Sequence, residues 1–219
     1  MTLDCSGSDP FGGRFVAEHP DNTILLGSGS PRRLRMLREA GWRVEVRPPA
    51  IDDGEILVQS GNPTSTVLSL AWFKAAQMEP LGAGFVGLAA DTVCVSEGRI
   101  LGKPHDPAEA LKMLGQLQGG VHMTVTGVCI IHRDHSRKFL FDAARVDFGD
   151  LSRSEITAYV DSGEWRGKAG GYNLVDRQVA GWPVRCQGDP TTVMGLPMLK
   201  LQPVLEGLAC PRPSIGGEE

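Results

Sequence analysis

The stretch TILLGSGSPRR, residues 23–33, decides which fold this chain is predicted to adopt. Residues 24–26 are a short apolar run of strand length, and the glycines that follow give the backbone room to turn. Ser30 is a good helix N-cap, and Pro31 suits the first helical position because its missing N–H would have no partner there. The stretch therefore predicts a buried strand, a polar loop and the first turn of a helix.

The polar groups of this loop are of the kind that binds phosphate. Backbone N–H groups at the helix start, the hydroxyls of Ser28 and Ser30, and the guanidinium groups of Arg32 and Arg33 would meet at one place. A dinucleotide-binding fingerprint is excluded because Arg32 stands where its third glycine would fall, and the chain has no P-loop motif. A plain strand-to-helix turn with solvated arginines remains the other interpretation of this stretch taken alone.

Length, charge and cysteine usage bound the class of protein. The 219 residues suit one α/β domain, or two small lobes that share a sheet. A net charge of −4 gives no overall attraction to nucleic acid or to an anionic membrane, so a site for polyanions must be local. Five scattered cysteines without a C-x-x-C pair argue for a reducing compartment, and no signal pattern or long apolar run occurs. We therefore expect a cytoplasmic protein with no nucleic-acid or membrane partner.

The chain divides into an arm, a domain and a tail. Residues 1–22, rich in Gly, Ser, Asp and Pro, are predicted to form a flexible N-terminal arm, residues 23–207 a single domain, and residues 208–219 a disordered tail. The alternation of apolar runs and helical patterns predicts an α/β fold. The predicted elements are a helix over 31–40, a strand over 42–47, a helix over 63–78, a strand over 85–90, a hairpin over 93–101, a helix over 107–117, strands over 121–132 and 138–148, a helix over 152–161 and a broken helix over 191–206.

Three aspartates are candidates for chemistry. Asp91 follows the apolar run 85–90, and ligands of open α/β sheets gather outside the carboxyl ends of strands. Asp52 and Asp53 form a carboxylate pair in a predicted loop, and together with Asp91 across a cleft they could hold Mg²⁺. A strand-terminating turn at Asp91 and a solvated loop at the pair are the alternatives.

Three lysines are candidate cations for substrate binding. Lys74 is the only charged residue of the helix predicted over 63–78, Lys103 lies in a Gly-Lys-Pro turn, and Lys168 lies in a glycine-rich loop. Each has a plainer interpretation, as a helix-edge lysine whose charged end reaches solvent or as a solvated loop residue. Taken with the serines, arginines and aspartates, they suit a polyphosphate ester with a divalent metal better than acyl or glycosyl chemistry.

These residues resemble those of the Maf family of nucleoside triphosphate pyrophosphatases, also called septum-formation inhibitor proteins. The matching blocks lie in the family's order over about residues 23–205, and they are SGSPRR at 28–33, KA at 74–75, ADTV at 90–93, LGKP at 101–104, KAGGY at 168–172 and VMGLP at 193–197. The resemblance implies a mixed twisted sheet in two lobes with a central cleft, similar to inosine triphosphate pyrophosphatases. It also implies hydrolysis of a nucleoside triphosphate to a nucleoside monophosphate and pyrophosphate, with a house-cleaning role.

The resemblance further implies roles for single residues. Asp91 matches the family's proton acceptor, and Asp52 or Asp53 matches an acidic position, so these three carboxylates are expected to hold a divalent cation, Mg²⁺ or Mn²⁺. The positions that match triphosphate contacts are Ser28, Ser30, Arg33, Lys74 and Lys103. A homodimer is the assembly that we consider for this chain.

The resemblance also bears on which base is recognised. In the family, three positions are linked to base preference, and Arg32, Thr92 and Val175 of this chain match them. Arg with Thr resembles the pyrimidine subclass, which takes dTTP and UTP, whereas that subclass has Gln where this chain has Val175. A valine offers none of the hydrogen bonds of a glutamine. A pyrimidine or a modified base is therefore expected, and a nucleotide-binding regulator of cell division with little turnover is the alternative function.

Overall fold

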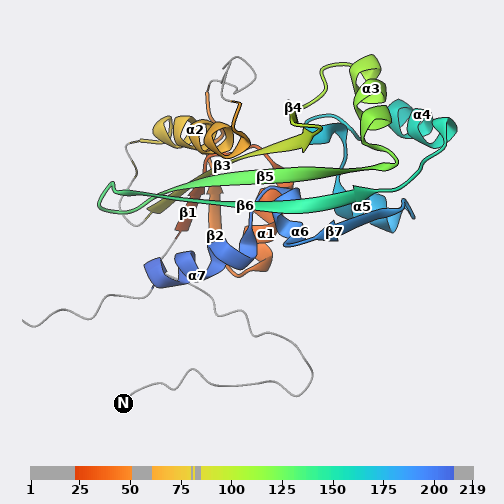
Figure 1. Cartoon of the computed structure of the whole chain (residues 1–219). Helices are drawn as coiled ribbons and strands as arrows, with labels where there is room; N and C mark the ends of the chain where they lie inside the picture. Colours follow the sequence, from red (N-terminus) through yellow and green to blue (C-terminus); the bar gives the residue numbers. More distant parts are fainter. Residues whose placement is uncertain (1–22, 51–60, 80, 82–84, 210–219) are drawn as a thin grey trace, which may run out of the picture.

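A computed structural model describes residues 23–50, 61–79, 81 and 85–209 (Figure 1). The arm predicted over 1–22 lies outside the described residues, and so does the predicted tail from residue 210 onward. Residues 208 and 209 belong to helix α7 (Met198–Ala209), where Leu208 packs against a hydrophobic cluster, so the folded domain extends past the predicted boundary at 207. None of the helices in the described part of the chain has the length and apolarity that crossing a bilayer requires.

Seven strands form one mixed sheet (Figure 1). They are β1 Thr23–Leu26, β2 Arg43–Val46, β3 Phe85–Ser96, β4 Arg99–Leu101, β5 Gly120–Ile131, β6 Arg137–Phe148 and β7 Val184–Gln187. The order across the sheet is β2-β1-β3-β5-β6-β7, and β4 pairs with the far end of β3. β1 runs parallel to β2 and β3, whereas the pairs from β3 through β7 are antiparallel. The expectation of a mixed α/β sheet is confirmed.

Helices cover both faces of this sheet. The remaining helices are α1 Pro31–Glu39, α2 Pro63–Ala76, α3 Pro107–Leu117, α4 Arg153–Ser162, α5 Leu174–Val179 and α6 Pro190–Met194, with a short 3₁₀ turn at Ala169–Gly171. Figure 1 shows α2 on one face of the sheet and α1, α6 and α7 on the other, while α3 and α4 lie together at the end where β4 is found. α5 and β7 are elements that the sequence patterns did not predict, since each is too short to show a clear period.

The hydrophobic residues form separate cores along the sheet, as the two-lobed architecture requires. Alternate residues of β1 face opposite sides, so Leu25 packs with α2 whereas Ile24 and Leu26 pack with α1 and α7. Another core gathers residues of α3, α4 and the far ends of β3 and β6, with Phe148 and Trp165 among them. The cleft described below lies between these parts.

The strand predicted to end at Ala90 does not end there. β3 is continuous from Phe85 to Ser96, because the backbone of Asp91 and Thr92 goes on pairing with β5. Asp91 thus lies in the middle of a strand, and the expectation that it follows a strand end is wrong. The strand that ends beside the cleft is β1. It pairs with β3 only as far as Leu26, and the residues that follow it line the cleft.

Gly127 of β5 allows α2 to lie close to the sheet beside Asp91. It stands opposite Asp91 in the pairing of β3 with β5, and a Cβ atom at this position would lie 2.8 Å from the carbonyl carbon of Val67 in α2. We expect Gly127→Ala to push α2 outward and to lower the free energy of unfolding by about 1–3 kcal/mol, as overpacking does. Urea titration followed by tryptophan fluorescence measures this change.

A second glycine provides the control for that experiment. Gly115 lies exposed in α3 with open space around its Cα, so Gly115→Ala should raise stability by about 0.5–1 kcal/mol through the better helix propensity of alanine. Equal effects of the two substitutions would show that Gly127 has no packing role.

Candidate active site

A cleft of about 510 Å³ opens beside the middle of β3, which is a volume typical of small-molecule sites. Its walls come from the loop after β1, the chain after β2, α2, β3, the turn after β4, the glycine-rich loop and the end of α6. The lining residues that carry side-chain chemistry are Ser28, Ser30, Arg32, Arg33, Lys74, Asp91, Thr92, Lys103, Thr124, Arg166 and Tyr172. Eight of the residues predicted for the site are therefore brought together although they come from distant parts of the chain.

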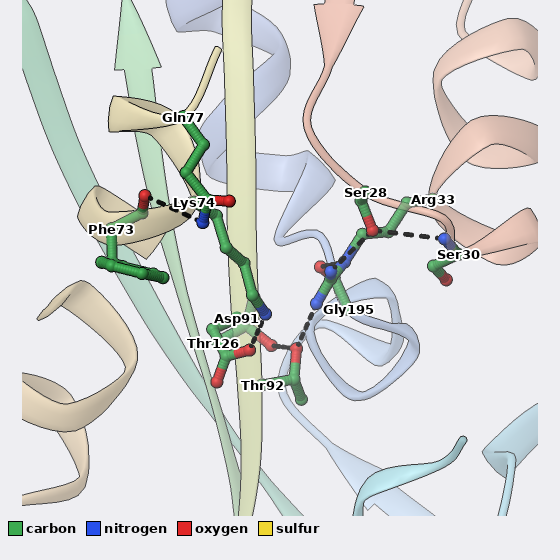
Figure 2. A network of polar contacts seen from close by, with 10 residues as sticks. All are labelled: Ser28, Ser30, Arg33, Phe73, Lys74, Gln77, Asp91, Thr92, Thr126 and Gly195. Atoms are coloured by element: carbon green, nitrogen blue, oxygen red, sulfur yellow. Dashed lines mark hydrogen bonds and ion pairs between the residues drawn. The ribbon is translucent and has the colours of Figure 1, made fainter. Parts of the chain in front are cut away.

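Asp91 and Lys74 form a buried ion pair in the cleft wall (Figure 2). The Lys74 Nζ atom lies 2.5 Å from Asp91 Oδ1, and each side chain is 7% exposed. Lys74 comes from α2, and Asp91 points to the α2 face of the sheet because it follows Ala89 by two residues. A buried carboxylate needs a charged or hydrogen-bonding partner, and Lys74 supplies it.

Arg33 ties the loop after β1 to the far side of the cleft. Its Nη1 group donates to Ser28 Oγ at 3.0 Å, its Nη2 group to Thr92 Oγ1 at 3.2 Å, and its Nε group to the Gly195 carbonyl at 2.9 Å (Figure 2). Gly195 ends α6 with a φ of 108°, a conformation that glycine adopts without strain. The three bonds fix the guanidinium of Arg33, a residue that lines the cleft and is only 9% exposed.

Ser28 and Ser30 have different places in the loop. Ser28 is buried, and its Oγ also accepts a hydrogen bond from the backbone N–H of Ser30 at 3.2 Å. Ser30 occupies the N-cap of α1 with an extended backbone, but its hydroxyl does not cap the helix as predicted. Ser28 thus organises the loop through its hydroxyl, and both serines line the cleft.

Lys168 and Val175 are not among the residues that line the cleft. The Lys168 Nζ atom lies 3.6 Å from Asp176 Oδ2, and the same carboxylate oxygen accepts from Asn173 Nδ2 at 2.7 Å. Burial lowers the pKa of Lys168, an effect that Asp176 opposes. Val175 lies on α5 with 38% of its surface exposed. The roles in substrate binding expected for these two residues stay predictions.

Arg32 lies on the same side of the site as Asp176 and does line the cleft. Burial lowers the pKa of its guanidinium, and the charge of Asp176 partly offsets this effect. Since an arginine stays protonated in any case, Arg32 presents a positive charge to the cleft.

Arg166 is a cleft residue that the sequence patterns did not reveal. Its guanidinium lies 4.8 Å from the centre of the Trp165 ring, a cation–π distance, at the rim of the cleft. A second basic residue two positions before Lys168 in the same glycine-rich loop was the available signal. The turn between Arg166 and Lys168 decides which of these two residues points into the cleft.

The described residues of the cleft offer one carboxylate to a divalent cation. Asp91 is the only carboxylate among the described residues that line the cleft, and the described part of the chain holds no group of three or more His, Cys, Asp or Glu residues that could bind a metal ion. Mg²⁺ commonly takes one or two carboxylates together with substrate phosphates and water, so Asp91 with a triphosphate would suffice. Asp52 and Asp53 lie outside the described residues, while Ala50, two positions before Asp52, lines the cleft.

Behind Tyr172, which lines the cleft, lies a buried histidine. His122 is 2% exposed, its Nε2 atom is 2.7 Å from the Tyr172 hydroxyl, and the two rings meet edge to face. Burial lowers the pKa of His122 to about 4, so the imidazole is neutral near pH 7. The pair supports the end of the glycine-rich loop from below.

This histidine makes stability depend on pH. The unfolded chain binds a proton at His122 near pH 6.5 but the folded chain only near pH 4, so the free energy of unfolding falls as pH drops through this window. The expected loss is up to about 3 kcal/mol, which His122→Gln should remove. Urea titrations between pH 7.5 and 4 measure the difference, with His105→Gln, an exposed histidine, as control. Parallel pH curves for wild type and His122→Gln would contradict the expectation.

The family model and the sequence relatives point to the same family. A family model described as Maf-like protein matches residues 23–208. A dTTP/UTP pyrophosphatase of Bacillus thuringiensis subsp. konkukian is 38% identical over 178 residues, which are 81% of this chain and 91% of that protein. A dTTP/UTP pyrophosphatase of Symbiobacterium thermophilum is also 38% identical, over 80% of this chain and 88% of that protein. Among solved structures, a HAM1 protein from Coxiella burnetii has a TM-score of 0.47 at 15% identity and covers 84% of this chain and 98% of its own.

Proposed function

This chain belongs to the Maf-like protein family, and from this we propose that it hydrolyses nucleoside triphosphates to nucleoside monophosphates and pyrophosphate. One observation carries the proposal: among the described charged residues of the cleft, Asp91 is surrounded by cations alone. They are Arg32, Arg33, Lys74, Lys103 and Arg166. Such a site suits a polyanion that is attacked next to a single carboxylate.

In the reaction we propose, a water oxygen forms a bond to the α-phosphorus and the bond from that phosphorus to the bridging oxygen of the β-phosphate breaks. Asp91 orients the water and accepts its proton, a task for a carboxylate held in a fixed position by Lys74. Pyrophosphate leaves with the negative charge of the broken bond. Lys103 and the arginines stabilise that charge.

A divalent cation, Mg²⁺ or Mn²⁺, is part of this proposal. Asp91 would hold it together with the triphosphate, and Asp52 or Asp53 would add a further carboxylate. When bound, the cation neutralises charge on the phosphate oxygens and lowers the pKa of a coordinated water.

We infer a preference for pyrimidine nucleotides from the relatives named dTTP/UTP pyrophosphatase. The alternative function, a nucleotide-binding regulator of cell division with little turnover, is not favoured, because the relatives are named as hydrolases. A cleft that carries both a carboxylate and cations is also more than binding alone requires.

A screen of nucleoside triphosphates, modified bases included, tests the proposal. We expect pyrophosphate and the nucleoside monophosphate from dTTP and UTP with Mg²⁺, and no release after EDTA until Mg²⁺ or Mn²⁺ is restored. Release of inorganic phosphate in place of pyrophosphate would refute the reaction. Tight nucleotide binding without turnover of any nucleotide would favour the alternative function, a nucleotide-binding regulator.

A further inference from the structure

A chain of threonine hydroxyls runs from the cleft into the protein. Thr92 Oγ1, at the cleft surface, lies 2.9 Å from Thr126 Oγ1 on the neighbouring strand β5 (Figure 2). Thr126 Oγ1 in turn donates to the backbone carbonyl of Thr192 in α6 at 2.7 Å. Thr126 and Thr192 are fully buried, and neither is among the residues that line the cleft.

The direction of each hydrogen bond in this series of threonine hydroxyls is fixed. A carbonyl oxygen only accepts, so the single proton of the Thr126 hydroxyl goes to Thr192. The contact between Thr126 and Thr92 then needs the proton of Thr92. With its proton turned inward, Thr92 acts as an acceptor at the cleft surface, and it accepts from Arg33 Nη2 at 3.2 Å.

An ionised side chain holds the inner end of this series of hydroxyls, at Thr192, in place. The Thr192 hydroxyl donates to Asp142 Oδ2 at 2.7 Å, and Lys200 Nζ lies 2.6 Å from Asp142 Oδ1. Burial raises the pKa of Asp142, but hydrogen bonds from Lys200 and Thr192 outweigh burial and place this pKa below its usual value. Asp142 is therefore ionised at neutral pH, which holds Thr192 in place and with it the carbonyl that orients Thr126.

An acceptor at this place in the cleft distinguishes among the groups of a nucleotide. Phosphate oxygens are acceptors at neutral pH, so Thr92 is not suited to face them. Uracil and thymine carry an N–H at ring position 3, whereas cytosine carries a lone pair there. A lone pair opposite the Thr92 oxygen would leave two acceptors in contact without a proton, which is unfavourable in a desolvated site.

We propose that Thr126 is a positioning residue for base selection, which keeps Thr92 an acceptor and so favours uracil and thymine nucleotides over cytosine nucleotides. The inference rests on the proposed function and adds to it a residue that does not touch the substrate. It assigns the preference to the orientation of one proton, held by a neighbouring strand.

The test compares Thr126→Val with Thr126→Ser, using kcat/KM for UTP and for CTP. The wild type and Thr126→Ser, which keeps the hydroxyl, should prefer UTP. In Thr126→Val the proton of Thr92 has lost its acceptor and can turn into the cleft, so the ratio of CTP to UTP activity should rise about tenfold. A purely structural role would lower both activities together and leave their ratio unchanged. If the melting temperature of Thr126→Val shows that this variant does not fold, Thr126→Ala is used in its place.

The outcomes separate the two proposals. Pyrophosphate release with an unchanged ratio in the folded variant overturns the role of Thr126 and leaves the proposed function intact. A wild type that uses CTP as well as UTP overturns the role of Thr126 too. Absence of pyrophosphate with every nucleotide refutes the proposed function itself.

Discussion

Asp91→Asn is expected to reduce the kcat for pyrophosphate release from UTP about a thousandfold. An amide has nearly the shape of the carboxylate, but it cannot accept the proton of the attacking water, and general-base catalysis commonly contributes factors of this size. KM should change much less, because the cations that we propose to bind the triphosphate remain. Steady-state kinetics with a pyrophosphate assay at saturating Mg²⁺ measure both constants.

The buried position of Asp91 requires a control for folding. Asp91→Asn leaves the Lys74 ammonium without the carboxylate 2.5 Å away, and breaking a buried pair typically costs about 3–5 kcal/mol of stability. The double variant Asp91→Asn with Lys74→Met removes both charges, so it should regain much of that stability while staying inactive. If turnover returned with stability in the double variant, Asp91 would be a structural residue and the mechanism would be wrong.

Arg33→Lys is expected to be the next most damaging substitution. The guanidinium of Arg33 donates to Gly195, Ser28 and Thr92 at once, and an ammonium cannot reproduce this planar arrangement. We expect a loss of about 2–3 kcal/mol in the free energy of unfolding, since hydrogen bonds from charged groups are among the stronger ones. A loss of about a hundredfold in kcat/KM should accompany it, because the loop that carries Ser28 would lose its fixed position.

Arg35→Lys is the matched control, because Arg35 lies exposed on the same helix two residues further on. It should leave both quantities unchanged. Urea unfolding and kinetics on the two variants test this expectation, and equal behaviour would show that the planar shape of the Arg33 guanidinium is not required.

Local patterns predicted most elements correctly where a short-range interaction defines them. Asn62, Asp106 and Ser152 are of the residue types that favour the N-cap position, and each accepts backbone hydrogen bonds at the start of a helix; Ser152 with Glu155 forms a complete capping box. The long hairpin of β5 and β6 was also predicted within one residue at each strand end. These features depend on residues a few positions apart, so the sequence contains their cause.

Most of the features that the sequence patterns did not show depend on distant partners. The strand through Asp91 was predicted to end at the charge, yet Lys74 neutralises the carboxylate and β5 continues the pairing, so the strand goes on. Lys168 and Arg166 have similar sequence surroundings, and the ion pair of Lys168 with Asp176 distinguishes their places. A pattern of single residues does not show which distant group a side chain will meet.

The sequence by itself determined the residue types of the loop at 27–33, from which phosphate binding is predicted, the family, and the types of residue that the cleft contains. Only the tertiary structure decided that Asp91 is buried against Lys74, that Arg33 is held from three sides, and that the hydroxyl of Thr92 is oriented by Thr126. The physical reason is range: caps, turns and periodic strands form between neighbours in the chain. A buried charge or a hydroxyl proton, in contrast, takes its state from atoms that only the folded sheet brings within hydrogen-bonding distance.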